Sequence, residues 1–217
     1  SPMRRGFFGR VLAASLAASV GASAMAVVRR HDVTEAQMLQ NALAFPQVGI
    51  LRYSNSTGDT RTANLVGDKF IVTAGHNLPG SGVTATVEFG GQTYTTSVWQ
   101  RHPNYNGSNL ALGYDICVAR LDRRVLNVAP FGIYPAFADE TGQAAWLVGW
   151  GRSGTGLTGI QSGTVGFRAG QNRVDYDSTT PNILLADFDS PDNPAENTLA
   201  SLGSTPEPMP FESCIAS

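Results

Sequence analysis

Short apolar stretches, many alternating with polar residues and ending at glycines or other turn formers, follow one another along the first half of the chain. This pattern predicts β-strands rather than long helices. The expected strands are residues 47–54, 62–67, 69–75, 84–100 and 114–122. The fourth stretch contains Gly90-Gly91 near its centre, so it is predicted to be a hairpin. Strands at this close and regular spacing favour a small closed barrel.

The second half of the chain has fewer strands, followed by a polar, proline-rich loop. We expect strands at residues 144–151, 159–170, 172–178 and 182–189, and the loop over 190–210. A second barrel of equal size would need more strands. A short helix is predicted from Glu35 to Ala44, because Thr34 and Gln37 form a capping-box pattern. The chain is therefore expected to be all-β, with a signal peptide over 1–26, a first barrel with a leading helix over 27–133, and a partial second barrel over 134–217.

The N-terminal residues predict export. A basic segment containing Arg4-Arg5 precedes an Ala-rich apolar stretch, residues 11–26, which ends in the small-x-small pattern Ala24-Met25-Ala26. The stretch is shorter than the ~20 residues that span a bilayer, so no membrane span is expected in the mature chain. A twin-arginine signal is left open as the export route. We expect a bacterial-type protein that is secreted or periplasmic.

Composition limits the classes of partner. Charged residues make up 15% of the chain and the formal net charge is −2. No block of basic residues follows Arg30, so the electrostatic footprint of a nucleic-acid-binding surface is missing. The two cysteines, Cys117 and Cys214, are too few for a disulfide scaffold. Cys117 is expected to be a small buried apolar residue, and the state of Cys214 is left open, as is the oligomeric state.

One histidine follows an apolar strand at a sharp turn. In the segment FIVTAGHNL, Ala74 and Gly75 precede His76, so the ring is free to point into a cleft. A histidine in such a place is more often structural than catalytic. Asp115 changes that balance, because a carboxylate at the mouth of an apolar strand is costly to bury without a partner. Paired with His76, it would orient the imidazole and leave the other ring nitrogen free as a base.

Several segments, in a fixed order, resemble the trypsin/chymotrypsin-like serine proteases. They are IVTAGH, HPNY, YDICVARL and VGWGRSG, at residues 71–76, 102–105, 114–121 and 148–154. The resemblance extends from about Phe45 to Gly154. It implies the double β-barrel of that family, with His76 as the general base and Asp115 as the carboxylate that orients it. It also implies a protein or peptide substrate and requires no cofactor or metal.

The third member of the catalytic triad is not found. The family's nucleophile lies in Gly-Asp-Ser-Gly-Gly, which does not occur among the 217 residues. The final segment PFESCIAS resembles the run that leads into that motif, so the nucleophile is expected shortly after Ser217, and no serine is assigned. The predicted function is a secreted serine endopeptidase that forms an acyl-enzyme, with residues 1–217 alone inactive. The alternative is an inactive homologue that uses its barrels for binding.

The chain departs from the family pattern at two places. Asn77 stands where many members carry a cysteine, and Thr62 stands at the position of that cysteine's partner. The resemblance therefore implies no disulfide next to the base, and strand packing is expected to hold the imidazole. Cleavage after Ala26 would expose Val27-Val28, which we hypothesise to insert toward an aspartate beyond the chain. No side-chain preference is predicted.

Two further patterns point elsewhere. The glycines of residues 149–154 match a dinucleotide-binding fingerprint, but the residues after them are poor helix formers, so the helix that such a site needs is not expected. The three aspartates within residues 187–192 fail the spacing of an EF-hand. They are expected to form an acidic surface loop, with an irregular calcium site as the alternative.

Overall fold

The computed structural model describes residues 26–53, 60–78, 83–134, 139–179, 182–193 and 213–216. Strands make up most of its secondary structure, which confirms the predicted all-β class. Residues 1–25 of the predicted leader, and residues 194–210 of the predicted polar loop, lie outside the described part. Among the described residues, no helix is long and apolar enough to cross a membrane.

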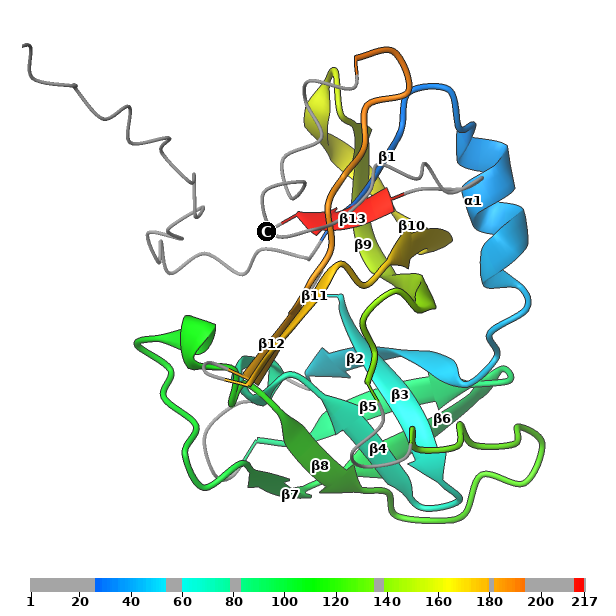
Figure 1. Cartoon of the computed structure of the whole chain (residues 1–217). Helices are drawn as coiled ribbons and strands as arrows, with labels where there is room; N and C mark the ends of the chain where they lie inside the picture. The colour runs from blue at the N-terminus through cyan, green and yellow to red at the C-terminus, as the bar shows by residue number, and fades with distance from the viewer. Residues whose placement is uncertain are drawn as a thin grey trace, which may run out of the picture.

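The first sheet has seven strands and curls into a barrel in the lower half of Figure 1. In hydrogen-bonded order the strands are β6 (Gln92–Thr96), β5 (Ala85–Phe89), β2 (Val48–Tyr53), β3 (Arg61–Gly67), β4 (Phe70–Thr73), β8 (Cys117–Arg120) and β7 (Val98–Arg101). The two edge strands, β6 and β7, are separated in sequence by Ser97 alone. The sheet must therefore curl until its edges meet, which encloses an apolar core that includes Leu51, Leu65, Ile71 and Phe89.

The predicted hairpin is confirmed. Strands β5 and β6 pair antiparallel, with Phe89 opposite Gln92, and Gly90 and Gly91 form the turn between them. Both glycines have positive φ, +54° and +74°. Two consecutive residues in this conformation are what a tight hairpin turn requires, and glycine adopts it without steric cost.

The second sheet has four strands in the order β10-β9-β1-β13. These are β10 (Gly159–Arg173), β9 (Ala144–Thr155), β1 (Ala26–Arg29) and β13 (Ser213–Ala216). A separate hairpin of β11 (Tyr176–Thr179) and β12 (Asn182–Leu185) extends from the end of β10 toward the barrel (Figure 1). Residues 172–178, predicted as one strand, are instead divided between β10 and β11. The four described strands do not close, in line with the expected incomplete second barrel.

Strand β1 was not predicted. It pairs parallel with β9 and antiparallel with β13, so both of its edges are occupied. Val27 and Val28 are buried within it. The hypothesised insertion of Val27 and Val28 toward an aspartate beyond the chain would therefore require β1 to leave the sheet.

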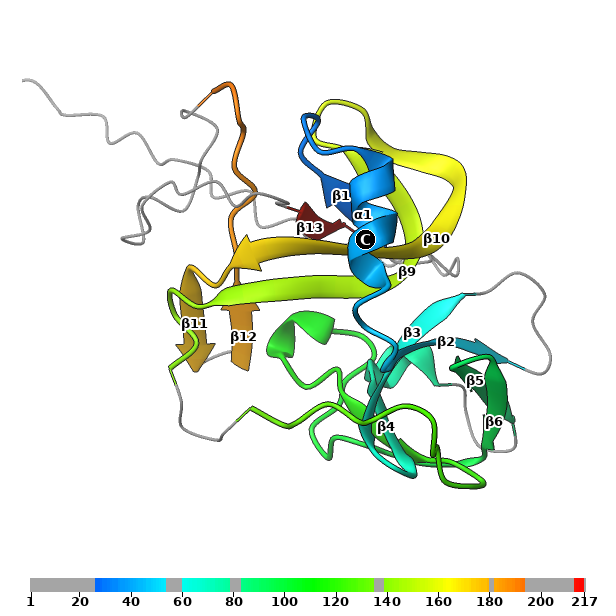
Figure 2. The ribbon, with the colours of Figure 1, turned by 90° about the vertical axis from the view of Figure 1, so that its right-hand side faces the viewer.

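Helix α1 covers one face of the second sheet, as Figure 2 shows. It runs from Glu35 to Ala42, and Thr34 and Gln37 form the predicted capping box at its start. Its Met38 is fully buried. A Cβ atom at Gly170 of β10 would lie 2.8 Å from the Met38 methyl group, so the absence of a side chain there lets the helix pack closely. The leading helix, which was expected with the first barrel, thus lies on the second sheet. The predicted domain boundary between residues 133 and 134 stays a prediction.

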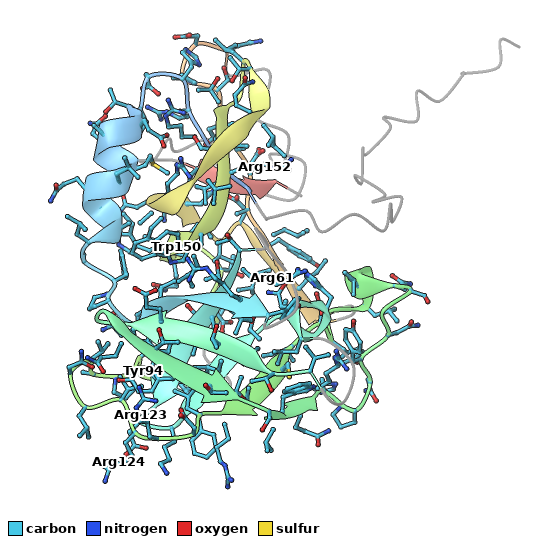
Figure 3. All side chains as sticks on the ribbon, turned by 180° about the vertical axis from the view of Figure 1, so that it is seen from behind. Arg61, Tyr94, Arg123, Arg124, Trp150 and Arg152 are labelled. Atoms are coloured by element: carbon cyan, nitrogen blue, oxygen red, sulfur yellow. The ribbon has the colours of Figure 1, made fainter. Side chains whose placement is uncertain are left out.

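A threonine joins the two sheets. The backbone N–H of Trp150 on β9 donates to Thr62 Oγ1 on β3, at 2.9 Å. A Cβ atom at Gly149 would lie 2.8 Å from the same oxygen, so the close approach requires glycine at that position. Figure 3 shows Trp150 above Arg61 at this junction. The segment VGWG is therefore part of the joint between the sheets.

An ion pair between a buried arginine and a partly exposed glutamate attaches α1 to the second sheet. Arg168 of β10 is only 4% exposed, and its Nε donates to Glu35 Oε1 at 2.6 Å. Ser153 Oγ donates to the other carboxylate oxygen at 2.9 Å. Burial acts to raise the pKa of Glu35, but the hydrogen bonds from Arg168 and Ser153 outweigh burial and hold that pKa below its ordinary value of 4.5.

We expect Glu35→Ala to lower the free energy of unfolding by about 1–2 kcal/mol, because it removes the carboxylate that pairs with the buried guanidinium of Arg168. Solvent screening of the partly exposed carboxylate keeps the loss below that of a fully buried pair. Urea unfolding at pH 7 would measure the loss. Because folding lowers the pKa of Glu35, its contribution is present above pH 4.5 and is lost as the pH falls through the folded-state pKa. The difference between wild type and variant should shrink accordingly in acid.

The matched control is Asp68→Ala. Asp68 pairs with Arg124 at 2.6 Å, but both side chains are about half exposed. Such a surface pair contributes less than about 1 kcal/mol. Equal losses in the two variants would contradict the role given to the Arg168–Glu35 pair.

Candidate active site

Adjacent strands bring His76 and Asp115 together. Strands β4 and β8 pair antiparallel, with Thr73 opposite Cys117. The chain leaves β4 after Thr73 and forms a short 3₁₀ turn, η1 (Gly75–Asn77), that carries His76. Asp115 lies just before β8 starts. The end of one strand and the start of its neighbour meet at the same edge, which places the two residues side by side.

Asp115 contacts His76 at two points. Its Oδ2 lies 2.6 Å from the ring Nδ1, and its Oδ1 accepts a hydrogen bond from the His76 backbone N–H at 2.9 Å. Burial acts to raise the pKa of Asp115, but the hydrogen bonds from the ring and backbone of His76 outweigh it and hold that pKa below its ordinary value. The carboxylate is therefore ionised at neutral pH, so Nδ1 donates and Nε2 is left as the basic nitrogen.

The glycine before His76 is required by its neighbours. A Cβ atom at Gly75 would lie 2.8 Å from the ring of Tyr105 and 3.1 Å from Asp115 Oδ1. Tyr105 belongs to the HPNY segment, so this part of the family pattern packs directly against the turn. Its His102 stacks on Tyr114, with ring centroids 4.8 Å apart, and takes no part in the His76–Asp115 pair.

Hydrogen bonds stand where the family's disulfide would be. Asn77 is 5% exposed, and its Nδ2 donates to Thr73 Oγ1 at 3.0 Å. Thr73 Oγ1 in turn donates to the Thr62 carbonyl at 2.7 Å. These three residues, here called the Asn77 brace, connect position 77 to position 62 without sulfur. The prediction that strand packing alone holds the imidazole missed them, although Asn and Thr can both form such bonds.

A cavity lies between the two sheets next to this pair. It has a volume of about 330 Å³ and is bordered on the barrel side by Asp115, Ile116 and Val72. On the other side it is bordered by Val148 and Trp150 of β9. Its walls are mostly apolar. Asp115 thus sits at the junction of the two sheets, partly removed from water.

The other predicted candidates lie elsewhere. Cys117 is buried, as expected, and burial raises the pKa of its thiol. Of the three aspartates, Asp192 pairs with His31 at 2.7 Å, and Asp189 is buried rather than on the surface. In the described part of the chain, no group of three or more His, Cys, Asp or Glu side chains is arranged to hold a metal ion. The three glycines that match a dinucleotide-binding fingerprint, Gly149, Gly151 and Gly154, lie within β9. The next element is the strand β10 and not a helix.

Comparison with known proteins identifies the family. The model of the Trypsin family matches residues 39–195, most of the chain. Among solved structures, GrC is 21% identical with a TM-score of 0.49, and the match covers 62% of this chain and 62% of that one. HL collagenase is 16% identical with a TM-score of 0.52, covering 66% and 69%. No curated protein matches.

The chain belongs to the trypsin family of serine proteases. Since the match to HL collagenase is distant in sequence, it shows the fold alone. The chain spans 62% of the length of the GrC structure it matches. The activity of the whole protein is therefore a proposal, made below.

We expect Asn77→Ala to lower the free energy of unfolding by about 1–2 kcal/mol, because it removes a buried hydrogen bond from the Asn77 brace. Asn127→Ala is a suitable control, since Asn127 is exposed and its Nδ2 donates to the Gly90 carbonyl at 3.2 Å. Urea unfolding of both variants would compare them. A loss at Asn77 no larger than the loss at Asn127 would argue against the brace.

Proposed function

We propose that the protein is a serine endopeptidase that hydrolyses peptide bonds through an acyl-enzyme. His76 is the general base, and Asp115 is the carboxylate that orients it. The observation that carries this proposal is the two-point contact of Asp115 with the ring and backbone of His76. This contact fixes the ring through Nδ1, and Nε2 makes no hydrogen bond to the described residues, which is the arrangement that a general base requires. Membership of a protease family supports a protein or peptide substrate.

The chemistry follows from the nitrogen that Asp115 leaves free. In acylation, Nε2 of His76 takes the proton of a serine hydroxyl while the serine oxygen bonds to the peptide carbonyl carbon. The same nitrogen then gives that proton to the leaving amine as the C–N bond breaks. In deacylation, Nε2 takes a proton from water while the water oxygen bonds to the acyl carbon. The ester bond to the serine oxygen then breaks, and Nε2 returns the proton to that oxygen. Asp115 stabilises the imidazolium formed in each step.

The nucleophile is proposed to lie after Ser217, in the Gly-Asp-Ser-Gly-Gly motif that the final residues resemble. The backbone N–H groups of that motif would also bind the developing oxyanion. On this proposal residues 1–217 alone do not catalyse hydrolysis, because they lack both the attacking oxygen and those donors. Export through the N-terminal segment is proposed for the same protein.

We expect a fluorophosphonate probe to label the longer protein that contains the serine and to leave residues 1–217 unlabelled. Asp115→Asn should lower the rate of peptide hydrolysis by about 10⁴-fold, because His76 would then be held as the wrong tautomer. His102→Ala should leave the rate unchanged and serves as the control. Gel fluorescence and a chromogenic peptide assay would measure the two effects.

Two results would contradict this proposal. Labelling of residues 1–217 alone would place the nucleophile within them. A longer protein that folds but neither reacts with the probe nor hydrolyses peptides would indicate a binding protein instead.

We expect the exported protein to begin at Val27, because Ala24 and Ala26 are the small residues that a signal peptidase requires before its cleavage point. N-terminal sequencing of protein recovered from the periplasm or the medium would test this. Recovery only from the cytoplasm, or a different first residue, would refute the predicted signal.

A further inference from the structure

We propose that Arg101, which no sequence pattern indicates, is a positioning residue that clamps the turn carrying His76. Arg101 is the last residue of β7, and its Nε donates to the Gly75 carbonyl at 2.7 Å. Its Nη2 donates to the Leu78 carbonyl. These two carbonyls lie on either side of His76 in the sequence. The inference rests on the proposed role of His76 as the base.

The turn needs support from outside. It is a three-residue 3₁₀ helix, closed by a hydrogen bond from Asn77 N–H to the Ala74 carbonyl at 3.0 Å. Its N-cap is Ala74, which has no side chain that could cap a helix, and Leu78 at its end is already extended, with φ −105° and ψ 134°. So short a helix leaves its terminal carbonyls without intrahelical partners. Arg101 supplies donors to a carbonyl at each end.

The shape of the guanidinium suits this task. Nε and Nη2 lie on the same edge of the planar group, so their N–H bonds point the same way and fix the spacing of two acceptors. A lysine ammonium would keep the charge but not this paired geometry. The distance between the Gly75 and Leu78 carbonyls, and hence the shape of the turn, is therefore set by Arg101.

Tyr105 holds the guanidinium in place. The Arg101 guanidinium lies over its ring, 5.3 Å from the centroid. The same ring packs against Gly75, where an added Cβ would come within 2.8 Å of it. One aromatic side chain thus contacts both the clamp and the turn. Arg101 approaches from β7, whereas the Asn77 brace reaches the turn from β3 and β4.

Loss of the clamp should move His76 relative to Asp115. The Nδ1–Oδ2 distance is 2.6 Å, and a bond this short is sensitive to small shifts of the backbone. A displacement of about 1 Å in a catalytic group can cost on the order of 10²-fold in rate. Since Arg101 donates to backbone carbonyls of the turn and not to the reacting atoms, we expect the loss in kcat rather than in KM.

The test compares Arg101→Lys with Arg120→Lys. Arg120 lies on the neighbouring strand β8 and is exposed, and it makes no side-chain hydrogen bond or ion pair with the turn among the described residues. In the longer protein, Arg101→Lys should lower kcat by about 10²-fold with little change in KM. Arg120→Lys should leave both unchanged. Arg101→Gln should also lose most of kcat, because both of its donor hydrogens lie on one nitrogen of a shorter, uncharged side chain.

A second measurement does not require activity. In residues 1–217, the proton on Nδ1 of His76 is observable by NMR, and it is assigned by its loss in His76→Ala. We expect this proton signal in wild type and in Arg120→Lys. In Arg101→Lys, we expect the proton to exchange with water at least about 10-fold faster, because its hydrogen bond to Asp115 is weakened.

The outcomes distinguish a failure of the Arg101 clamp from a failure of the proposed role of His76. Wild-type exchange in Arg101→Lys overturns the clamp, whatever the activity of the longer protein. Absence of the signal in wild type itself refutes the orientation of His76, and with it the proposed function. If both Arg101 variants fail to fold while Arg120→Lys folds, Arg101 is a residue of general stability and the positioning role is wrong.

Discussion

The contact between the Asp115 carboxylate and the turn of His76 is the constraint around which this end of the barrel is built. One oxygen holds the ring and the other holds the backbone, so the ring cannot rotate and the turn cannot shift without losing a hydrogen bond. Gly75 has no side chain because the carboxylate and Tyr105 occupy the space that one would need. Arg101 then secures the carbonyls that the short turn leaves free.

The same region also joins the two sheets, so the geometry of the His76–Asp115 pair and the arrangement of the sheets are coupled. Thr62 accepts a hydrogen bond from Trp150 through its hydroxyl and one from Thr73 through its carbonyl. Thr73 in turn accepts from Asn77, next to His76. A chain of hydrogen bonds therefore runs from β9 to the turn, and Gly149 permits it by leaving room for the threonine.

The sequence predicted correctly those features that depend on a few neighbouring residues. The Gly90-Gly91 turn and the start of α1 follow from backbone conformation and capping, and both are confirmed. Strand β1 was missed because its four residues carry no alternation and its partners lie far away in the sequence. The proximity of His76 and Asp115 was expected both from the cost of burying an unpaired carboxylate and from the family resemblance. The contact of Arg101 with the turn was not expected. Arg101 lies 25 residues after His76 in the sequence, and nothing in the local pattern indicates that the fold brings the two together.

The Asn77 brace contains only hydroxyl, amide and carbonyl groups. Its assembly therefore requires no oxidant and no choice between cysteine partners. Thiol reductants cannot open it. In this chain the alignment of the histidine turn is independent of redox conditions, which is a property that a disulfide at the same two positions would not provide.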